Sequence, residues 1–332
     1  MSALAEAGVA PDTAMIAAAA RRLAPVVRCT PLLSSPFLDD IAGRRVLVKA
    51  ECLQHTGSFK FRGGFAAVSA LSADARAQGV LAWSSGNHAQ GVALAARMHG
   101  VRAVIVMPRD APRTKIDATR ALGAELVLHD RATEPREEIG ARLIAEQGLT
   151  LIRPFDDPQV VAGQASTGLE LAQQAEAEGV ARADVLVPCG GGGLTAGVAL
   201  ALANTAPGLR VRPVEPEGFD DTVRSLATGA PQSNTARTGL CDAILTPAPG
   251  ALTFPVLQRL CGPGLVVSDR DTLRAMGAAF ERLKLVIEPG GAVALAAALF
   301  QPQVLTADAV IVIASGGNVD RAVFARALAL ED

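Results

Sequence analysis

The sequence contains no tyrosine, and aromatic residues make up only 3% of its 332 residues. Surfaces that bind single-stranded nucleic acid stack bases on aromatic rings, so the composition argues against such a surface. An excess of one charge is also missing, because 31 basic and 33 acidic residues leave a formal net charge of −2. Without a basic excess, neither nucleic acid nor an anionic membrane surface is an expected partner.

Long apolar runs are absent as well. A run such as Ala309 to Ala314 is far shorter than the roughly 20 residues that cross a bilayer. Residues 1–15 contain acids and no basic residue, which argues against a secretory signal. The five cysteines are scattered without a C-x-x-C pair. We therefore expect reduced thiols, a cytoplasmic location, and neither a disulfide scaffold nor a structural zinc site.

Half of the residues are apolar, which is enough for a sizeable core. Short β-branched runs alternate with Ala-, Leu- and Arg-rich segments of helical period, and this alternation predicts an α/β fold with parallel sheets covered by helices. The predicted strands are 45–50, 80–84, 103–107, 125–129, 151–154, 184–189, 210–215 and 309–315. The predicted helices lie near 12–24, 58–71, 88–99, 112–122, 136–147, 163–178, 195–204, 269–285, 290–300 and 318–329.

The chain is long enough for two domains. Residues 56–150 contain several strand–helix units, so we predict that they form a small α/β domain. Residues 1–55 and 151–332 would then form a larger domain. Ligands of parallel sheets bind beyond the carboxyl ends of the strands, and glycine-rich turns follow several predicted strands here.

The densest of these turns is Gly190–Gly193, between a predicted strand and a predicted helix. Four glycines let backbone N–H groups converge on an anion, and the helix N-terminus adds positive potential, so a phosphate is the expected guest. No Gly-Lys-Ser/Thr ends the turn, which excludes a Walker loop. Gly191-x-Gly193-x-x-Ala196 followed by Glu215 also approximates a dinucleotide fingerprint, and a tight turn without any ligand is a further alternative.

Lysine occurs at only four positions, and Lys60 is set among Ser58, Phe59, Phe61 and glycines. Partial burial lowers the pKa of a lysine and frees its amine to form a Schiff base. A solvent-exposed lysine in the first turn of a helix is the plainer interpretation of such a residue.

Two further turns carry polar groups. The segment from Ser84 to His88 offers hydroxyls, an amide and helix N-terminal N–H groups that suit a carboxylate, although Ser85 or Asn87 would also serve as an ordinary helix N-cap. Ser315-Gly-Gly-Asn318 follows a strongly apolar strand. Its glycines permit close approach of a flat ring, and Ser315 would bond a ring nitrogen; a bare strand–helix turn is the alternative.

Together, T-G-S-F-K-x-R-G, S-S-G-N-H, G-G-G-G-L and S-G-G-N occur in the order found in the serine/threonine dehydratase and serine racemase group of fold-type II pyridoxal-phosphate enzymes. The resemblance runs from Thr30 to Asn318. It implies a tryptophan synthase β-like fold, in which two parallel-sheet α/β domains have the active site between them and the larger binds the cofactor. It also implies pyridoxal 5'-phosphate as cofactor, a small amino acid as substrate, and a homodimer.

The resemblance also implies roles for individual residues. Lys60 resembles the lysine that binds the cofactor and acts as general base at Cα, and Ser85 would be the acid–base group on the opposite face in a racemase. The other implied cofactor contacts are Phe59 against the ring, Asn87 at the 3'-oxygen, Ser315 at the pyridine nitrogen, and Gly190, Gly191, Gly192, Gly193 and Leu194 around the phosphate. The implied substrate contacts are Ser84, Ser85, Asn87, His88 and Arg136.

The segment from Glu215 to Asp221 resembles the region where racemase-like members bind Mg²⁺ or Ca²⁺. The resemblance implies Glu215, the Phe219 carbonyl and Asp221 as ligands, and oxygen ligands suit a hard cation. An acidic helix start is the alternative. Arg237-Thr-Gly-Leu240 departs from the A-D-G-I/V of many members, which leaves the preferred substrate open.

A neutral serine at the pyridine nitrogen makes the cofactor a weaker electron sink, which favours prompt loss of a β-leaving group. The first hypothesis is therefore a dehydratase that converts threonine, serine or 3-hydroxyaspartate into a 2-oxo acid and ammonia. A serine- or aspartate-type racemase on the same scaffold is the nearest alternative. An NAD-dependent oxidoreductase and a non-catalytic ligand sensor are the remaining ones.

Overall fold

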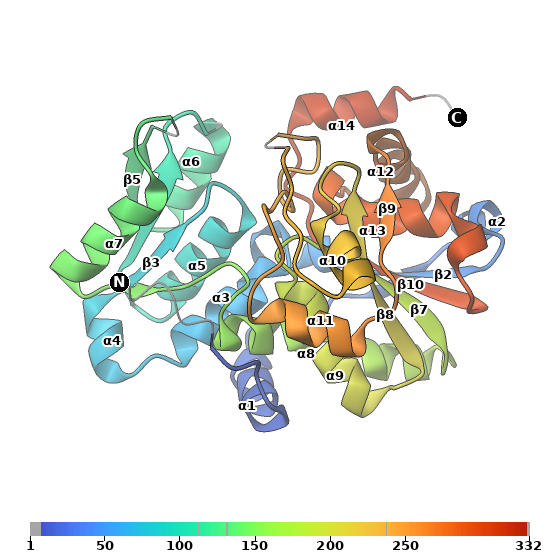
Figure 1. Cartoon of the computed structure of the whole chain (residues 1–332), viewed down its shortest axis with the longest axis horizontal. Coiled ribbons are helices and arrows are strands. Elements are labelled where there is room, and N and C mark those ends of the chain that lie inside the picture. Colours follow the sequence, from blue (N-terminus) through green and yellow to red (C-terminus); the bar gives the residue numbers. More distant parts are fainter. Residues whose placement is uncertain (1–7, 112, 131, 237, 331–332) are drawn as a thin grey trace. The chain divides into compact units, whose positions relative to one another are not determined.

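The computed structural model of the chain describes residues 8–330 apart from 112, 131 and 237. Contacts divide the chain into two compact units, each built on a sheet with parallel pairing (Figure 1). The smaller unit contains the described residues up to Val27 and Lys60–Gly163; the larger contains Arg28–Phe59 and the described residues from Gln164 onward. The α/β class predicted from the alternation of strands and helices is confirmed.

The sheet of the smaller unit has the order β5-β4-β3-β6, and all of its pairs are parallel. Its strands are β3 (Val80–Trp83), β4 (Ala103–Pro108), β5 (Glu125–His129) and β6 (Thr150–Leu151). Its helices are α1 (Thr13–Leu23), α3 (Lys60–Ser69), α4 (Ala73–Gln78), α5 (Asn87–Met98), α6 (Arg113–Ala121) and α7 (Arg136–Gln147), and α8 (Pro158–Ala177) contains the boundary at Gly163.

Two glycines let α3 and α5 approach closely. A Cβ atom at Gly91 would lie 2.9 Å from the backbone carbon of Lys60, and one at Gly64 would lie 3.0 Å from the carbonyl carbon of Gly91. Larger residues would force the helices apart. The first turn of α3, which carries Lys60, is therefore packed directly against α5.

The two units differ from the division expected from the sequence at three places. Residues 8–27 and 151–163 belong to the smaller unit, and residues 56–59 belong to the larger one. In α1, Arg22 explains the first difference: its Nε donates to Ser69 Oγ at 2.9 Å and its Nη2 to the Ala66 carbonyl at 3.3 Å. These contacts attach α1 to α3. No local periodicity signals such a docking, because it depends on residues far apart in the chain.

The larger unit has the sheet order β1-β2-β10-β7-β8-β9, with β1 antiparallel and the other pairs parallel. Its strands are β1 (Leu32–Ser34), β2 (Arg45–Lys49), β7 (Ala183–Pro188), β8 (Leu209–Pro216), β9 (Leu265–Val267) and β10 (Ala309–Ile313). Its helices include α2 (Pro36–Ala42), α9 (Gly193–Thr205), α10 (Asp221–Thr228), α11 (Thr253–Leu260), α12 (Asp269–Leu283), α13 (Pro289–Phe300) and α14 (Arg321–Leu328).

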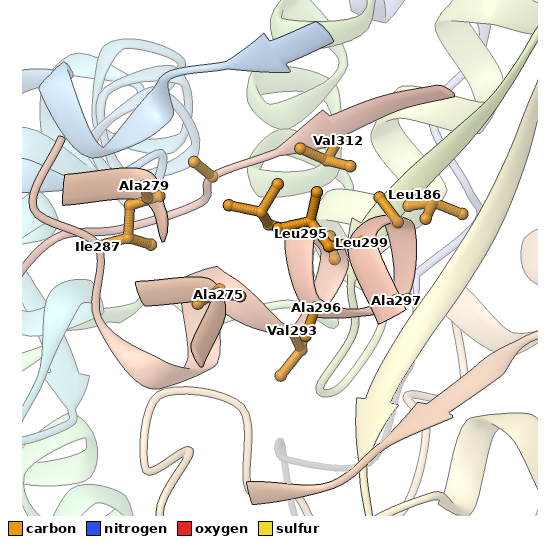
Figure 2. Packing of buried hydrophobic residues seen from close by; sticks show 14 of the residues in the cluster. Leu186, Ala275, Ala279, Ile287, Val293, Leu295, Ala296, Ala297, Leu299 and Val312 are labelled. Carbon is orange, nitrogen blue, oxygen red and sulfur yellow. The ribbon is translucent and has the colours of Figure 1, made fainter. Parts of the chain in front are cut away.

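The core of the larger unit surrounds α13, which is buried almost from end to end. A helix that is apolar on all sides belongs in a protein interior. Figure 2 shows Leu295 and Leu299 of this helix among Val312 of β10, Leu186 of β7 and Ala275 of α12. This packing holds β7 and β10 in place, and the turns after these two strands carry the predicted site.

Each predicted strand overlaps an observed one, whereas β1, β9 and the short helices α2, α4, α10 and α11 were not predicted. The two missed strands have three residues each and lie at the edges of the sheet. So short a segment offers too little alternation to be recognised. Among the described residues, no helix combines the length and apolarity needed to cross a bilayer.

Candidate active site

In the larger unit, the residues that precede Lys60 pair with the turn after β10. Ser58 forms a β-bridge with Gly316, and the Phe59 N–H donates to the Ser315 carbonyl at 3.1 Å. Asn318 Nδ2 donates to the carbonyl of Thr56, 262 positions earlier, at 2.7 Å. Two of the four motifs recognised in the sequence therefore lie side by side.

The turn before this pairing has an unusual backbone. Thr56 has a φ of 57°, a left-handed conformation that costs a non-glycine residue about 1–2 kcal/mol. Gly57 follows with a φ of 72°, and a Cβ atom there would lie 2.7 Å from Asn318 Oδ1. The hydrogen bond from Asn318 thus holds a strained turn that lies four residues before Lys60 in the chain.

Lys60 and His88 both bond to the segment that follows β6 in the smaller unit. Lys60 Nζ donates to the Pro154 carbonyl at 2.9 Å, and His88 Nε2 lies 2.9 Å from the Ile152 carbonyl. Lys60 is half-buried and His88 is buried. The amine of Lys60 therefore points to a backbone carbonyl inside the unit, which does not fit the alternative of a solvent-exposed lysine.

The imidazole of His88 is neutral at physiological pH. Burial, and then the charge of Lys60, lower the pKa of His88 to about 3. In a neutral ring the nitrogen that faces a carbonyl must carry the proton, so Nε2 donates to Ile152 and Nδ1 is left as an acceptor. A neutral His88 gives no positive charge for a substrate carboxylate and instead ties α5 to the segment after β6.

This shift predicts an acid-dependent loss of stability. The unfolded chain protonates His88 near 6.5, whereas the folded protein does so only near 3, so between these values the unfolded state binds more protons and stability falls as pH falls. At pH 5 the loss relative to pH 8 is about 2 kcal/mol. We expect denaturant unfolding of cofactor-free His88→Gln protein to lack this part of the pH dependence. Equal pH dependence in both proteins would contradict the assignment.

The loop after β3 presents the N-terminus of α5 without a side-chain cap. The N-cap is Gly86, so neither Ser85 nor Asn87 caps the helix as the plainer interpretation had it. The Ser84 hydroxyl accepts the Gly86 N–H at 3.1 Å and orders the loop, and Asn87 is 9% exposed as the first residue of the helix. An uncapped helix N-terminus has N–H groups that the helix cannot satisfy, which suits an anion such as a carboxylate.

Arg136 lies apart from this group within the smaller unit. It begins α7 after β5, and β5 and β6 are opposite edges of the sheet. Its Nε donates to its neighbour Glu137 at 2.8 Å, and both side chains are exposed. The structure therefore brings Lys60 and His88 together on the β6 side but does not place Arg136 with them.

In the larger unit the four-glycine turn connects β7 to α9. Gly192 is the N-cap of α9, with a φ of 86° and no side-chain cap. A Cβ atom at Gly190 would lie 3.0 Å from the Ile244 carbonyl oxygen. The left-handed φ and the tight packing explain why glycine is needed, and the uncapped N–H groups of the first turn suit an anion.

This turn and Ser315 share one edge of the sheet. β10 and β7 are parallel neighbours, with Val312 paired to Leu186, so Gly190 and Ser315 follow adjacent strand ends. Ser315 is only 4% exposed, and its carbonyl holds the N–H of Phe59. The larger unit thus combines an uncapped helix N-terminus, a buried hydroxyl and an aromatic residue at the carboxyl edge of its sheet.

An acidic residue at the end of β8 caps a helix. Glu215 accepts the N–H groups of Thr222 at 3.2 Å and Val223 at 2.8 Å, at the start of α10. Burial, and then Asp221, raise the pKa of Glu215 well above its ordinary value. A carboxylate that is occupied in this way does not match the ribose-binding acid of a dinucleotide site.

Asp221 is the second acid of this segment. Burial raises the pKa of Asp221 to about 6, although Asn234 donates to its Oδ1. Its Oδ2 is buried and has no hydrogen-bond partner among the described residues. Nowhere among the residues that the structure describes are three or more His, Cys, Asp or Glu side chains arranged to bind a metal. Backbone carbonyls would therefore have to complete any cation site. Arg237 of the departing motif lies outside the described residues.

Several groups of this site had no sequence signal. The Ile152 and Pro154 carbonyls hold His88 and Lys60, but a backbone acceptor leaves no trace in residue type. Asn318 was noticed as part of a motif, yet its bond to Thr56 joins distant segments. Only the tertiary structure assigns these partners.

Known proteins match the chain over most of its length. Residues 23–316 match the family model described as pyridoxal-phosphate dependent enzyme. The L-threo-3-hydroxyaspartate ammonia-lyase of Saccharomyces cerevisiae is 42% identical over 304 residues, 91% of either chain. The serine racemase of Oryza sativa subsp. indica is 40% identical over 323 residues, 94% of this chain and 92% of the relative. A solved threonine deaminase from T.th. has a TM-score of 0.87 and 46% identity, covering 93% of this chain and 99% of that one.

The matched region includes Lys60, the loop after β3, the glycine turn and Ser315, and it confirms the resemblance inferred from the motifs. It also replaces the dinucleotide interpretation of the glycine turn, with which the capping role of Glu215 already disagrees. By sequence and by fold, the chain belongs to the family of pyridoxal-phosphate dependent enzymes.

Proposed function

We propose that Lys60 holds the pyridoxal 5'-phosphate and that the enzyme eliminates water from a small β-hydroxy amino acid, giving a 2-oxo acid and ammonia. The observation that carries the proposal is the pairing of Phe59 with Ser315. It fixes the residue next to Lys60 against the proposed partner of the pyridine nitrogen. Ser315 in turn shares a sheet edge with the glycine turn proposed to bind the phosphate.

The residues present fit this cofactor. Gly190, Gly191, Gly192, Gly193 and Leu194 would bind the phosphate through the uncapped first turn of α9. Ser315 would bond the pyridine nitrogen, Phe59 would pack on the ring, and Asn87 would bond the 3'-oxygen. When bound, pyridoxal phosphate supplies an electron sink that makes the Cα proton of an amino acid removable.

The chain's own groups would then orient the substrate and move protons. The uncapped N-terminus of α5, with Ser84, Ser85 and Asn87, would bind the substrate carboxylate. Lys60 Nζ would take the Cα proton. In the cofactor-free protein, the Pro154 carbonyl accepts a hydrogen bond from that amine. His88 would not bind the carboxylate, because its imidazole is neutral. Its hydrogen bond to the Ile152 carbonyl would instead hold α5 in position.

The substrate class rests on the relatives, which are named for L-threo-3-hydroxyaspartate and threonine. We propose threonine, serine or 3-hydroxyaspartate for this chain. Similarity to a serine racemase supports a second activity, racemisation, for which Ser85 would be the acid–base group opposite Lys60. Arg136 is also proposed as a substrate contact, although it follows β5, at the edge of the sheet opposite to β6, and pairs with Glu137. A cytoplasmic homodimer is part of the same proposal, and sedimentation of the pure protein tests its oligomeric state.

A divalent cation is also proposed at Glu215, the Phe219 carbonyl and Asp221. Two features support it: the charge of Asp221 disfavours ionisation of the buried Glu215, and Asp221 Oδ2 has no hydrogen-bond partner among the described residues. A cation would favour the ionised form of both acids, and oxygen ligands suit Mg²⁺ or Ca²⁺. The Glu215 carboxylate already accepts two backbone N–H groups of α10, so the cation and the helix would share this carboxylate.

A substrate panel tests the function. Purified protein is expected to be yellow, and at least one of L-serine, L-threonine and 3-hydroxyaspartate should release 2-oxo acid and ammonia in equal amounts. Chiral chromatography of recovered serine detects a racemase. Added Mg²⁺ or Ca²⁺ should raise the melting temperature, and Asp221→Asn should remove that response. A yellow protein that releases no keto acid from any hydroxy amino acid, L or D, would overturn the dehydratase proposal.

A further inference from the structure

The carbonyl group of Gly191, inside the glycine turn, accepts hydrogen bonds from Thr253 at the start of α11 and from Gly250 just before this helix. Thr253 Oγ1 donates to it at 2.6 Å, and the Gly250 N–H donates to it at 3.2 Å. The Gly250 carbonyl also lies 3.3 Å from Thr253 Oγ1, but a hydroxyl has one proton and Gly191 is nearer. Thr253 is fully buried, so this hydroxyl does not exchange its partner for water.

The direction of this carbonyl determines the direction of the next amide. In a trans peptide unit the C=O and the following N–H point to opposite sides. Because the Gly191 carbonyl points to Thr253, the Gly192 N–H must point away from Thr253. Gly192 is the N-cap of α9, so this N–H belongs to the donors at the helix N-terminus that suit an anion.

Without such an anchor the peptide unit would be free to rotate. Glycine lies on both of its sides, and glycine adopts left- and right-handed φ with similar ease. The close fit of Thr253 adds to the constraint: a Cβ atom at Gly192 would lie 2.9 Å from Thr253 Oγ1. The buried hydroxyl of Thr253 makes the shorter of the two hydrogen bonds that hold this peptide in one orientation, and the Gly250 N–H makes the longer one.

We propose that Thr253 is a positioning residue of the phosphate site: its hydrogen bond to the Gly191 carbonyl aims the Gly192 N–H at the cofactor phosphate. The proposal rests on the proposed function, since it takes the glycine turn as the phosphate site. Thr253 touches no phosphate oxygen in this scheme and acts only through the Gly191–Gly192 peptide. Its loss should therefore weaken binding of the phosphate and leave binding of the pyridine ring unchanged.

The test measures dissociation constants of the cofactor-free protein for pyridoxal 5'-phosphate and for pyridoxal, which lacks the phosphate. Thr253→Val keeps the shape and removes the hydroxyl, so the dissociation constant for pyridoxal phosphate should rise about tenfold. Thr253→Ser keeps the hydroxyl and should stay within about twofold of the wild type. Pyridoxal should bind all three proteins equally. Thr272→Val is the matched control, because Thr272 is also buried and donates to a backbone carbonyl, that of Ser268.

The outcomes separate the two proposals. A wild-type protein that binds no pyridoxal phosphate defeats the proposed function itself. If the wild type binds it and Thr253→Val binds it equally well, or if that variant loses pyridoxal to the same extent, the positioning role is wrong. If Thr253→Val does not fold, Thr253→Ala removes the hydroxyl with a smaller side chain and is judged by the same criteria. Thr272→Val should match the wild type for both ligands.

Discussion

Lys60→Ala protein is expected to be colourless and to release ammonia more slowly than the wild type by a factor of about 10²–10⁴, the typical contribution of a general base. The variant loses both the amine that binds the cofactor and the group that takes the Cα proton. Visible absorbance of the bound cofactor and its bleaching by borohydride measure the loss of the amine that binds the cofactor. The rate of 2-oxo acid formation measures the loss of the group that takes the Cα proton.

Lys60→Arg is the sharper variant. Arginine keeps the positive charge and a donor for the Pro154 carbonyl, yet it stays protonated and forms no Schiff base. It should fold like the wild type, lack the borohydride-sensitive colour and be as inactive as Lys60→Ala. Lys115→Ala, in α6, controls for the loss of a lysine elsewhere. Retained colour and activity in Lys60→Arg would remove the basis of the proposed function.

Gly192→Ala is expected to lose stability and cofactor affinity together. A left-handed φ costs alanine about 1–2 kcal/mol, and the new Cβ would lie 2.9 Å from Thr253 Oγ1 and 3.1 Å from Thr253 Cβ. Relief of this contact moves either α11 or the glycine turn, and we expect the dissociation constant for pyridoxal phosphate to rise by more than about tenfold. Denaturant unfolding and cofactor titration measure the two effects.

A second glycine separates backbone strain from loss of the site. Gly179 has a φ of 71°, and a Cβ atom there meets nothing within 4 Å. Gly179→Ala should therefore show the cost in stability of the left-handed backbone without any change in cofactor affinity. If Gly192→Ala bound the cofactor as tightly as Gly179→Ala does, the glycine turn would not be the phosphate site.

The sequence predicted local backbone structure correctly where the signal was local. The turn at Gly190–Gly193 needs glycine because of its own backbone and its immediate packing, and a helix N-terminus follows it in the chain. Local signals did not select the N-cap of α5, because Ser85 and Asn87 are better capping residues by type than Gly86, which holds that position. The charge state of His88 could not be predicted from the sequence, because its lowered pKa depends on burial and on the nearby Lys60.

The order of residues by itself determined the α/β class, the parallel strands and the four motifs, because alternation of strands and helices and glycine-rich turns are properties of neighbouring residues. The tertiary structure alone decided that Phe59 bonds to Ser315, that Glu215 caps α10, and that Thr253 holds the Gly191 carbonyl. Each of these contacts joins segments far apart in the chain or uses a backbone group. Such a contact forms only when the core brings the segments together, so no pattern of adjacent residues indicates it.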